Sequence, residues 1–229
     1  MAGRSISRGI RGTPRDLTQA AMWYRKAADQ GNARAQWNLG CMYHQGQGVY
    51  QDLSAAASWF RKAADQLDAF LSPFAQSMLG CMYRDGKGVP RDLAEAAAWF
   101  RKAADQGNAL AQYSLGCISL LDEDASQDLT EAAAWFRKAA DQGYVDAQLK
   151  MGWMYSEGAG VPQDRGQAAA WFRKASYQDN ADAQYILGCW YRDGEGVTQD
   201  IAQAVAWFRK AAANGYADAQ ACLSEVTLR

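Results

Sequence analysis

Few side chains of this chain could do chemistry, and their spacing matches no familiar catalytic pattern. His44 is the single histidine and no nucleophile elbow lies beside it, so a Ser-His-Asp arrangement is not indicated. The chain contains no Ser-x-x-Lys, Cys-x-x-Cys or His-Glu-x-x-His sequence, which are patterns of acyl transfer, thiol chemistry and zinc binding. We therefore predict no catalytic, cofactor or metal site, with His44 solvated at the end of a helix.

Five cysteines are too few for a scaffold built on disulfides. Cys41, Cys81, Cys117 and Cys189 each follow a Leu-Gly pair at the same point of a repeated pattern. Equivalent positions of stacked repeats should lie roughly 10 Å apart, whereas a disulfide tolerates a Cα separation of about 7 Å. We predict reduced thiols, which are either a sign of a reducing compartment or simply small apolar side chains that fit.

A glycine-rich sequence could cradle a phosphate group, but its context favours a turn. The pattern Gly-x-Gly-Val occurs at 46–49, 86–89, 158–161 and 194–197. No strand is predicted before it, and an aspartate follows each copy at the expected start of a helix. We predict a tight turn between two helices at each of these places.

Composition and charge narrow the class of protein. Proline is limited to 4 residues, while Ala, Gln, Arg, Lys and Leu are frequent, which favours helix. The net charge is -1, so no general positive field would hold a nucleic acid, and we predict no nucleic-acid partner. Residues 1–12 are polar and basic without an apolar stretch. We therefore predict no membrane insertion and a cytoplasmic protein, secreted only if its N-terminus were truncated.

An internal repeat must position all of these side chains. Trp-Phe-Arg-Lys or Trp-Tyr-Arg-Lys begins at residues 23, 59, 99, 135, 171 and 207, so successive copies lie 36, 40, 36, 36 and 36 residues apart. The longer spacing comes from four residues inserted within 68–74. A period of this length indicates a solenoid of helix pairs.

The second helix of each repeat is predicted to open at an aspartate that caps it. These aspartates are Asp16, Asp52, Asp92, Asp128, Asp164 and Asp200. The helix is predicted to stop at a glycine in four copies, namely Gly31, Gly107, Gly143 and Gly215. Leu67 and Asp179 replace that glycine, so we expect looser or differently built turns there.

The first helix of each repeat contains a glycine, at 40, 80, 116, 152 and 188. Because an internal glycine costs about 1 kcal/mol against alanine, its recurrence indicates that another backbone packs against it. Repeat three departs from the pattern, since residues 119–126 lose the turn glycines and form an acidic segment that exposes Leu120 and Leu121.

We predict one domain, 1–229, with an all-α fold: a solenoid of about twelve helices. Its parts are a flexible start (1–15), a half repeat (16–30), five full repeats (31–66, 67–106, 107–142, 143–178, 179–214) and a C-terminal half repeat (215–229). Each of the two half repeats supplies one helix of a pair.

The unit Ala-Gln-x-x-Leu-Gly-x-x-Tyr-x-x-Gly-x-Gly-Val-x-x-Asp-x-x-x-Ala-x-x-Trp-Phe-Arg-Lys-Ala-Ala resembles the Sel1-like repeat, a relative of the tetratricopeptide repeat. The resemblance extends over about residues 12–223. It implies a right-handed α-α superhelical solenoid of antiparallel helices, with the first helices on the concave side. It also implies that the protein is a non-catalytic scaffold or adaptor that binds a partner protein or peptide.

Two other functions stay open. A penicillin-hydrolysing activity has been attributed to cysteine-rich relatives with two cysteines per repeat, a pattern from which this chain departs, so a β-lactam hydrolase is one alternative. The near-identical copies allow a fragment or a consensus-like array without a dedicated partner. Exposed stacking surfaces at both ends would favour end-to-end self-association.

Comparison of the copies selects a binding face. Positions that stay fixed serve the stack, whereas positions that vary on the concave side can recognise a partner. Projection of the first helix, with the concave side taken from the resemblance, gives the partner-binding set Arg34, Trp37, His44, Arg84, Tyr113, Leu120, Leu121, Trp153, Tyr185 and Arg192. This set is rich in the residue types that dominate binding hot spots, while the six repeated tryptophans are predicted to be core.

Overall fold

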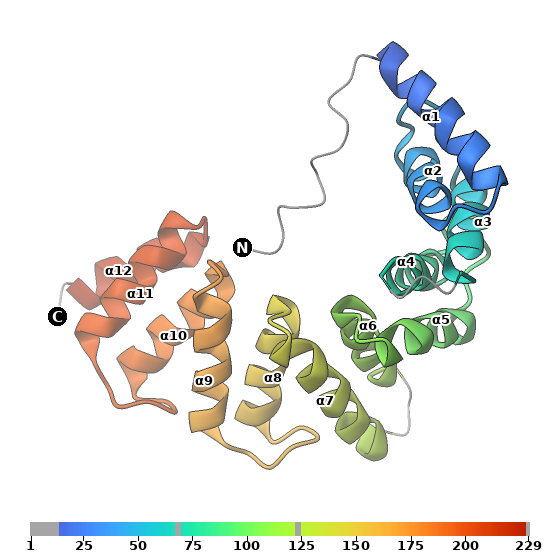
Figure 1. Ribbon diagram of the computed structural model, residues 1–229. Helices are drawn as coiled ribbons and strands as arrows, with labels where there is room; N and C mark the ends of the chain where they lie inside the picture. The colour runs from blue at the N-terminus through green and yellow to red at the C-terminus, as the bar shows by residue number, and fades with distance from the viewer. Residues whose placement is uncertain (1–13, 67–69, 122–124, 228–229) are drawn as a thin grey trace. The chain divides into compact units, whose positions relative to one another are not determined.

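The computed structural model describes residues 14–66, 70–121 and 125–227, and every regular element in this part of the chain is an α-helix (Figure 1). The elements are α1 (Pro14–Asp29), α2 (Ala33–Gln45), α3 (Leu53–Ala64), α4 (Ser72–Asp85), α5 (Leu93–Asp105), α6 (Ala109–Ser119), α7 (Ala125–Asp141), α8 (Val145–Glu157), α9 (Arg165–Ser176), α10 (Ala181–Asp193), α11 (Ile201–Ala213) and α12 (Ala217–Thr227). The prediction of an all-α repeat fold with about twelve helices is confirmed.

The chain divides into two compact units, Met1–Ser114 and Leu115–Arg229, with the boundary inside α6. In the first unit each helix from α1 to α4 packs on the next helix in sequence, and in the second unit each helix from α7 to α11 does the same. Packing between sequence neighbours is the solenoid arrangement. None of the described helices combines the length and apolar character needed to cross a membrane. The single domain with its repeat boundaries stays a prediction.

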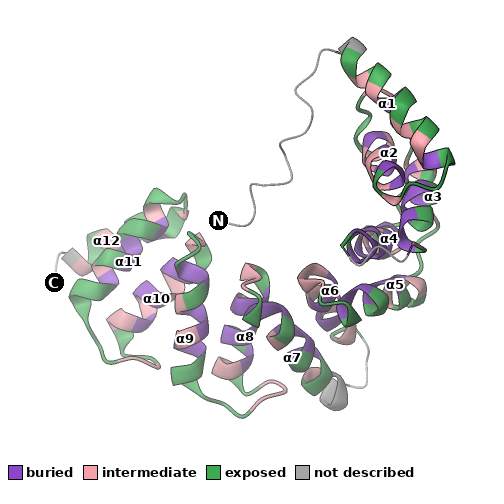
Figure 2. Cartoon of the chain, in the orientation of Figure 1, coloured by how far each residue is buried: buried purple, intermediate pink, exposed green. Residues whose placement is uncertain are grey.

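The repeated tryptophans are core in the five inner copies and exposed in the first. Trp59, Trp99, Trp135, Trp171 and Trp207 are 4–7% exposed, and the phenylalanine that follows each of them is fully buried. Trp23 is 67% exposed, so the prediction that all six tryptophans are core is wrong for this copy. Figure 2 shows the reason, since buried residues are frequent on the inner helices whereas α1 is mostly exposed.

Aspartate caps begin four of the second helices as predicted. The Oδ1 atoms of Asp52, Asp92, Asp164 and Asp200 accept a hydrogen bond from the backbone N–H three residues later, at 2.8–3.0 Å. The prediction is wrong for the other two copies. Because α1 begins at Pro14 and α7 at Ala125, Asp16 and Asp128 lie inside helices, and Pro14 and Arg15 belong to α1 rather than to a flexible start.

Three first helices have caps that the sequence analysis did not single out. Asn32, Asn108 and Asn180 accept from the N–H three residues later, at 2.8–2.9 Å. The signal was available, because an asparagine directly before a helical segment is a strong N-cap residue. Both helices of a pair therefore begin at a side-chain cap in two repeats, at Asn32 with Asp52 and at Asn180 with Asp200.

The Gly-x-Gly segments are turns, as predicted. Their first glycine ends the first helix in the left-handed conformation, with φ between 67° and 76°. A Cβ on the second glycine, for example Gly48 or Gly88, would lie less than 3.0 Å from backbone atoms of Leu17 or Leu53 in the preceding second helix. Because only glycine permits this approach, the turn packs directly on the second helix of the previous repeat.

The turn at Asp179 keeps the left-handed conformation of the glycine turns, but α9 ends at Ser176, one position earlier in the repeat than α5, α7 and α11. Asp179 has φ 59°, the same left-handed region as Gly31, Gly107, Gly143 and Gly215. The surrounding helices fix the conformation and the aspartate tolerates it, since Asp and Asn enter this region more readily than other non-glycine residues. The other replacement, Leu67, lies outside the described residues.

The glycine inside each first helix faces a phenylalanine ring, not another backbone. A Cβ on Gly40, Gly80, Gly116, Gly152 or Gly188 would lie less than 3.0 Å from the ring of Phe60, Phe100, Phe136, Phe172 or Phe208 respectively. The predicted close approach is confirmed and the predicted partner was wrong. Each pair joins the first helix of a repeat to its second helix.

A buried glutamine in each first helix joins neighbouring helices by hydrogen bonds. The Nε2 atoms of Gln36, Gln76, Gln112, Gln148 and Gln184 donate to the carbonyl eight or twelve residues earlier, at 3.1–3.3 Å. In three repeats its Oε1 accepts from an amide thirty residues later, as in Gln106 to Gln76 at 2.8 Å. Buried polar groups must be satisfied in this way, so these bonds fix the register of the pair.

Candidate protein-binding face

The Trp-Phe-Arg-Lys tetrapeptide holds the first helix in place from the second. The phenylalanine packs on the helix glycine, and the lysine lies over the tryptophan three residues before it, as Lys174 does over Trp171 at 3.6 Å. The arginine donates to the tyrosine hydroxyl of the first helix, as in Arg173 to Tyr191 at 3.0 Å. Two of these three interactions, those of the phenylalanine and the arginine, join the segment to the first helix and orient its outward side.

The candidate surface, which we call the first-helix face, consists of the variable positions on the first helices. In the first unit it contains Arg34, Trp37, His44, Arg84 and Tyr113. In the second unit it contains Leu120, Leu121, Trp153, Tyr185 and Arg192. Each half is described by itself, and the assignment of these residues to a partner stays a prediction.

Three aromatic members rest on the buried phenylalanines. The ring centroid of Trp37 lies 5.1 Å from Phe60, that of Trp153 lies 5.3 Å from Phe172, and that of Tyr185 lies 5.8 Å from Phe208. Tilted and edge contacts at these distances are favourable. Because the phenylalanine already restrains each ring, the ring loses little conformational entropy when a partner contacts its exposed part.

Trp153 is the most exposed of these aromatics. It is 44% exposed, and it occupies the position that holds Cys41, Cys81, Cys117 and Cys189 in the other repeats. Those cysteines are half-buried and pack in the stack. A tryptophan at this position adds a large apolar surface that packing of the repeat does not require.

Tyr185 is more constrained than the two tryptophans. Its ring stacks on Tyr216 with centroids 4.3 Å apart, and its hydroxyl lies 3.7 Å from the Sγ atom of Cys222. This hydrogen bond, with burial, raises the pKa of Tyr185 above its ordinary value, so the hydroxyl stays neutral. The side chain therefore contributes a partly covered, uncharged ring.

The two arginines at the ends of first helices are engaged with the next residue. Arg84 Nε donates to Asp85 at 2.8 Å, and Arg192 donates to both carboxylate oxygens of Asp193 at 2.8 Å. These bonds lower the pKa of Asp85 and of Asp193. Arg192 and Asp193 thus form a pair without net charge, whereas Asp85 also lies 3.4 Å from Lys87 Nζ, so that group keeps a positive charge. Sequence spacing alone did not indicate these pairs.

The remaining predicted residues differ in exposure. Arg34 is exposed on α2, and Tyr113 is half-buried on α6. His44 is half-buried in the last turn of α2, with its ring 6.5 Å from that of Phe60, so it is less solvated than expected. Leu120 and Leu121 are 40% and 64% exposed, as predicted, while the acidic residues 122–124 lie outside the described residues.

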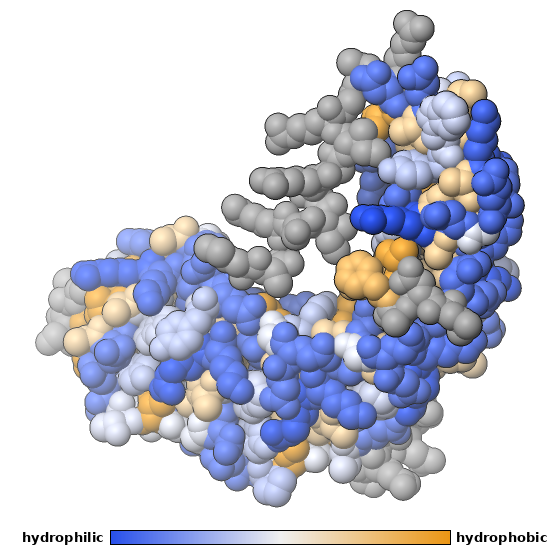
Figure 3. Space-filling view, in the orientation of Figure 1, coloured by the Kyte–Doolittle hydropathy of each residue, from blue (hydrophilic) through white to orange (hydrophobic). Residues whose placement is uncertain are grey.

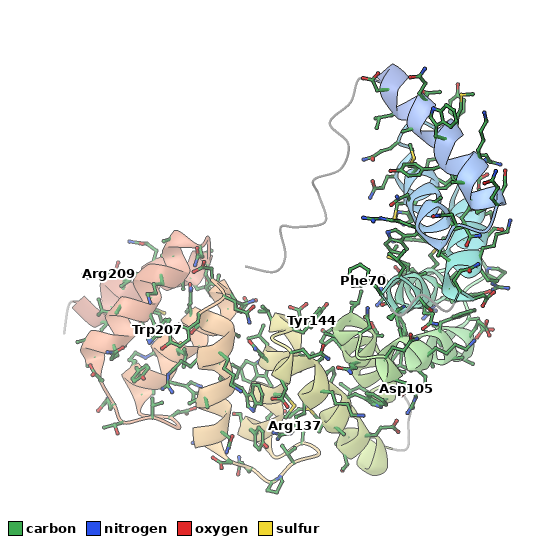
Figure 4. The ribbon with its side chains drawn as sticks, viewed as in Figure 1. Phe70, Asp105, Arg137, Tyr144, Trp207 and Arg209 are labelled. Carbon is green, nitrogen blue, oxygen red and sulfur yellow. The ribbon has the colours of Figure 1, made fainter. Side chains whose placement is uncertain are left out.

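The sequence analysis missed two exposed phenylalanines at the start of α4. Phe70 and Phe74 are 73% and 39% exposed, and their ring centroids lie 5.7 Å apart. Figure 3 shows apolar side chains gathered there, and Figure 4 shows Phe70 projecting from the start of α4. Phe74 occupies the helix position of Arg34, so the projection that selected Arg34 should also have selected Phe74.

Cys41, Cys81 and Cys189 are thiols of low reactivity. None of the five cysteines is in a disulfide. Burial raises the pKa of Cys41 to about 11 and also raises the pKa of Cys81 and Cys189. Because the thiolate is the nucleophile, these side chains are poor candidates for covalent chemistry. Among the described residues no group of three or more His, Cys, Asp or Glu could hold a metal ion.

A model of the Sel1 repeat matches residues 1–32, 33–66, 73–108, 109–144, 145–180 and 181–216. Among solved structures, the chain is similar to a protective antigen with an SLR fold, present in uropathogenic Escherichia coli strains. The identity is 40% and the TM-score 0.85, over 92% of this chain and 44% of the antigen, so this chain spans less than half the length of that protein.

A Sel1 repeat protein from Oxalobacter formigenes is similar at 29% identity with a TM-score of 0.74, over 92% of this chain and 88% of the other. An immunity protein from Pseudomonas aeruginosa, at 22% identity with a TM-score of 0.53 over 88% and 75% of the two chains, shares the fold alone. A comparison with curated proteins found no match.

Proposed function

The chain belongs to the Sel1 repeat family, and from this premise we propose that it is a non-catalytic scaffold that binds a segment of a partner protein on its first-helix face. Trp153 carries the proposal. It is a large apolar side chain, 44% exposed, anchored on Phe172, at a position where four other repeats have cysteine. Anchored, exposed tryptophans are the residues most enriched in binding hot spots.

The chemistry of the face favours a peptide or a helix with apolar side chains. Trp37, Trp153 and the exposed pair Phe70 and Phe74 offer apolar contacts, while the arginine–aspartate pairs offer polar contacts at helix ends. Recognition of an extended segment or an amphipathic helix uses this combination of anchors and polar groups. The net charge of -1 supports a protein partner rather than a nucleic acid.

Selection of peptides from a random displayed library tests the proposal. A peptide selected on the wild-type protein should bind at least about tenfold more weakly to Trp153→Cys, which installs the residue of the other repeats at that position. Tyr50→Ala is the matched control, because Tyr50 is 98% exposed on a turn outside the first-helix face. Equal dissociation constants for wild type, Trp153→Cys, Trp37→Ala and Phe74→Ala would reject the face.

A pull-down from lysate complements the selection. The intact chain should retain a partner that Trp37→Ala/Trp153→Ala loses, while both proteins keep the same helical circular dichroism. The non-catalytic part of the proposal is tested separately. Turnover of a chromogenic β-lactam by the pure protein would contradict it and support a hydrolase.

A further inference from the structure

A cleft of about 620 Å³ lies within the second compact unit, where its lining residues come from α9, α10, α11 and the segments that join them. Among these residues are Arg173, Tyr177, Tyr191, Asp200, Gln203 and Trp207. We propose that the cleft binds a carboxylate group of a ligand, held by the indole of Trp207 (Figure 4) and the guanidinium of Arg173. The cleft shares no residue with the first-helix face, so the inference does not rest on the proposed function.

The indole nitrogen of Trp207 supplies the observation that points to a ligand. Trp207 is 6% exposed, and its Nε1 atom is buried without a hydrogen-bond acceptor among the described residues. A buried N–H group without an acceptor is unfavourable, and nearly all such groups in proteins are hydrogen-bonded. Trp207 therefore lacks an acceptor on the wall of a cleft that can admit one.

Two other repeats show which acceptor suits this indole. Trp99 Nε1 donates to Glu95 Oε1 at 2.9 Å, and Trp135 Nε1 donates to Glu131 Oε1 at 3.0 Å. Each glutamate lies four residues before its tryptophan, on the same face of the helix. The equivalent residue on α11 is Gln203, which is exposed and uncharged. A ligand carboxylate would take the position that the two glutamates occupy in their own repeats.

A second position beside Trp207 also lacks a negative charge. Tyr177 directly follows α9, and its ring centroid lies 6.1 Å from that of Trp207. Four other repeats have an acidic residue at this position, namely Asp29, Asp65, Asp105 and Asp141. Of the five inner tryptophans, Trp207 is therefore the one for which both neighbouring positions are uncharged.

The positive charge of the site is present as in the other repeats. Arg173 is the equivalent of Arg25, Arg61 and Arg137, and its Nη2 atom donates to the hydroxyl of Tyr191 at 3.0 Å. A guanidinium has five N–H donors, so others remain for a ligand. Hydrogen bonds between a guanidinium and a carboxylate are among the strong ones in proteins. A carboxylate in the cleft would thus meet both a positive charge and an indole that needs an acceptor.

One carboxylate, that of Asp200, is among the lining residues and does not exclude the ligand. Asp200 Oδ1 caps α11 by accepting from the backbone N–H of Gln203 at 3.0 Å. Asp92 makes the same cap at 2.9 Å in the repeat where the Glu95 carboxylate accepts from the Trp99 indole. An indole-bound carboxylate therefore coexists with a capping aspartate in this fold.

Chemical shifts of the indole N–H groups test the proposal in the intact chain. Trp207→Phe identifies the Trp207 signal among those of the nine tryptophans in a heteronuclear NMR spectrum. Titration with N-acetylglutamate amide should move this signal downfield in a saturable way, with a dissociation constant of roughly 1–10 mM for so small a probe. The signals of Trp99 and Trp135 should stay in place, because Glu95 and Glu131 already accept from these indoles.

Two further probes identify the chemistry and its source. N-acetylglutamine amide has nearly the same shape as the first probe but no charge, so it should give no saturable shift. N-acetylglycine carries only the carboxylate of a chain end. A response to it would extend the site to chain ends, and a response to the glutamate probe alone would restrict it to acidic side chains. Equal responses to the glutamate and glutamine probes, or no saturable response to either carboxylate, would overturn the proposal.

Gln203→Glu should place a carboxylate of the chain itself in the ligand's position. The new side chain can accept from Trp207 as Glu95 does from Trp99, so the Trp207 signal should move downfield without a probe. The dissociation constant of N-acetylglutamate amide should rise at least about tenfold. The matched change Glu95→Gln should move the Trp99 signal upfield. Helical circular dichroism checks that both variants are folded, and unchanged probe affinity in folded Gln203→Glu would overturn the proposal.

Discussion

Trp23 and Trp59 occupy the same position of the repeat, yet they are 67% and 7% exposed. The local sequences are nearly the same, since Arg-Lys-Ala-Ala-Asp follows both pairs of aromatic residues, so the difference comes mainly from the helices packed around them. At the position of Trp153 the residue type changes instead: Trp153 is exposed, whereas the cysteines at this position in the other repeats are half-buried. For single residues, the residue type therefore predicts burial or exposure only when the helices packed around the side chain are known.

Replacement of Asp179 by glycine should stabilise the protein. Asp179 is held at φ 59°, a conformation that costs a side chain roughly 1 kcal/mol and that glycine adopts freely. Asp179→Gly should therefore raise the free energy of unfolding by about 1 kcal/mol, measured by urea denaturation. The matched reverse change, Gly143→Asp at φ 86°, should lower it, and equal stability of all three proteins would contradict the prediction.

Stability should fall at alkaline pH partly through Cys41. Burial raises its pKa from 9.0 to about 11, which means that the native state favours the neutral thiol. The stabilisation is complete below pH 9.0 and is lost as the pH rises through about 11. Urea midpoints across this range should fall less steeply for Cys41→Ala than for wild type, and parallel slopes would exclude the contribution.

The helix pairs depend on contacts between elements that recur in every repeat. The helix glycine against the phenylalanine ring, the glutamine against a backbone carbonyl and the turn glycine against the preceding helix each join different elements. Phe136, Phe172 and their equivalents are fully buried because a glycine without a side chain lies against each ring. Removal of one such contact should therefore lower the stability of its own helix pair more than that of the other pairs.

Gly188→Ala tests the glycine–phenylalanine contact. The added Cβ would lie less than 3.0 Å from the fully buried ring of Phe208, so we expect a loss of about 1–3 kcal/mol in the free energy of unfolding. Gly166→Ala is the control, because its Cβ would meet only the Asp164 carboxylate at 3.3 Å. That change should alter stability by less than about 1 kcal/mol. A similar loss in both variants would indicate a general helix effect instead.

The whole molecule consists of two compact units, divided inside α6. Helices in each unit pack on their neighbours in sequence, so stability should be a sum of local terms rather than one global core. A partner segment is proposed to meet the first helices of this array.

Hydrogen exchange after two matched substitutions tests this independence. Phe100→Leu should reduce protection mainly in α3 to α5, and Phe172→Leu mainly in α8 to α10, because both rings are fully buried in equivalent contacts. Mass spectrometry of peptide fragments reads each unit separately. Equal loss of protection in both units for either variant would show a single cooperative domain.

The sequence by itself determined the helices, the turns and the family resemblance. Hydrophobic spacing, aspartate caps and turn glycines act within a few residues of the chain, so their signals are local and repeat in every copy. The cysteines as thiols followed from the spacing of the repeats. The predicted helix starts at Asp16 and Asp128 were wrong, because α1 and α7 begin two or three residues earlier, at Pro14 and Ala125.

Only the tertiary structure decided which side chains are covered. It paired Arg84 with Asp85, placed Phe74 on the exposed side of α4, replaced a predicted backbone contact at Gly40 by the ring of Phe60, and left Trp23 open. Burial depends on residues that lie far apart in the sequence or in the next repeat, and no local rule contains that information. For this protein, local sequence therefore predicts the elements, and packing between elements selects the surfaces that can bind.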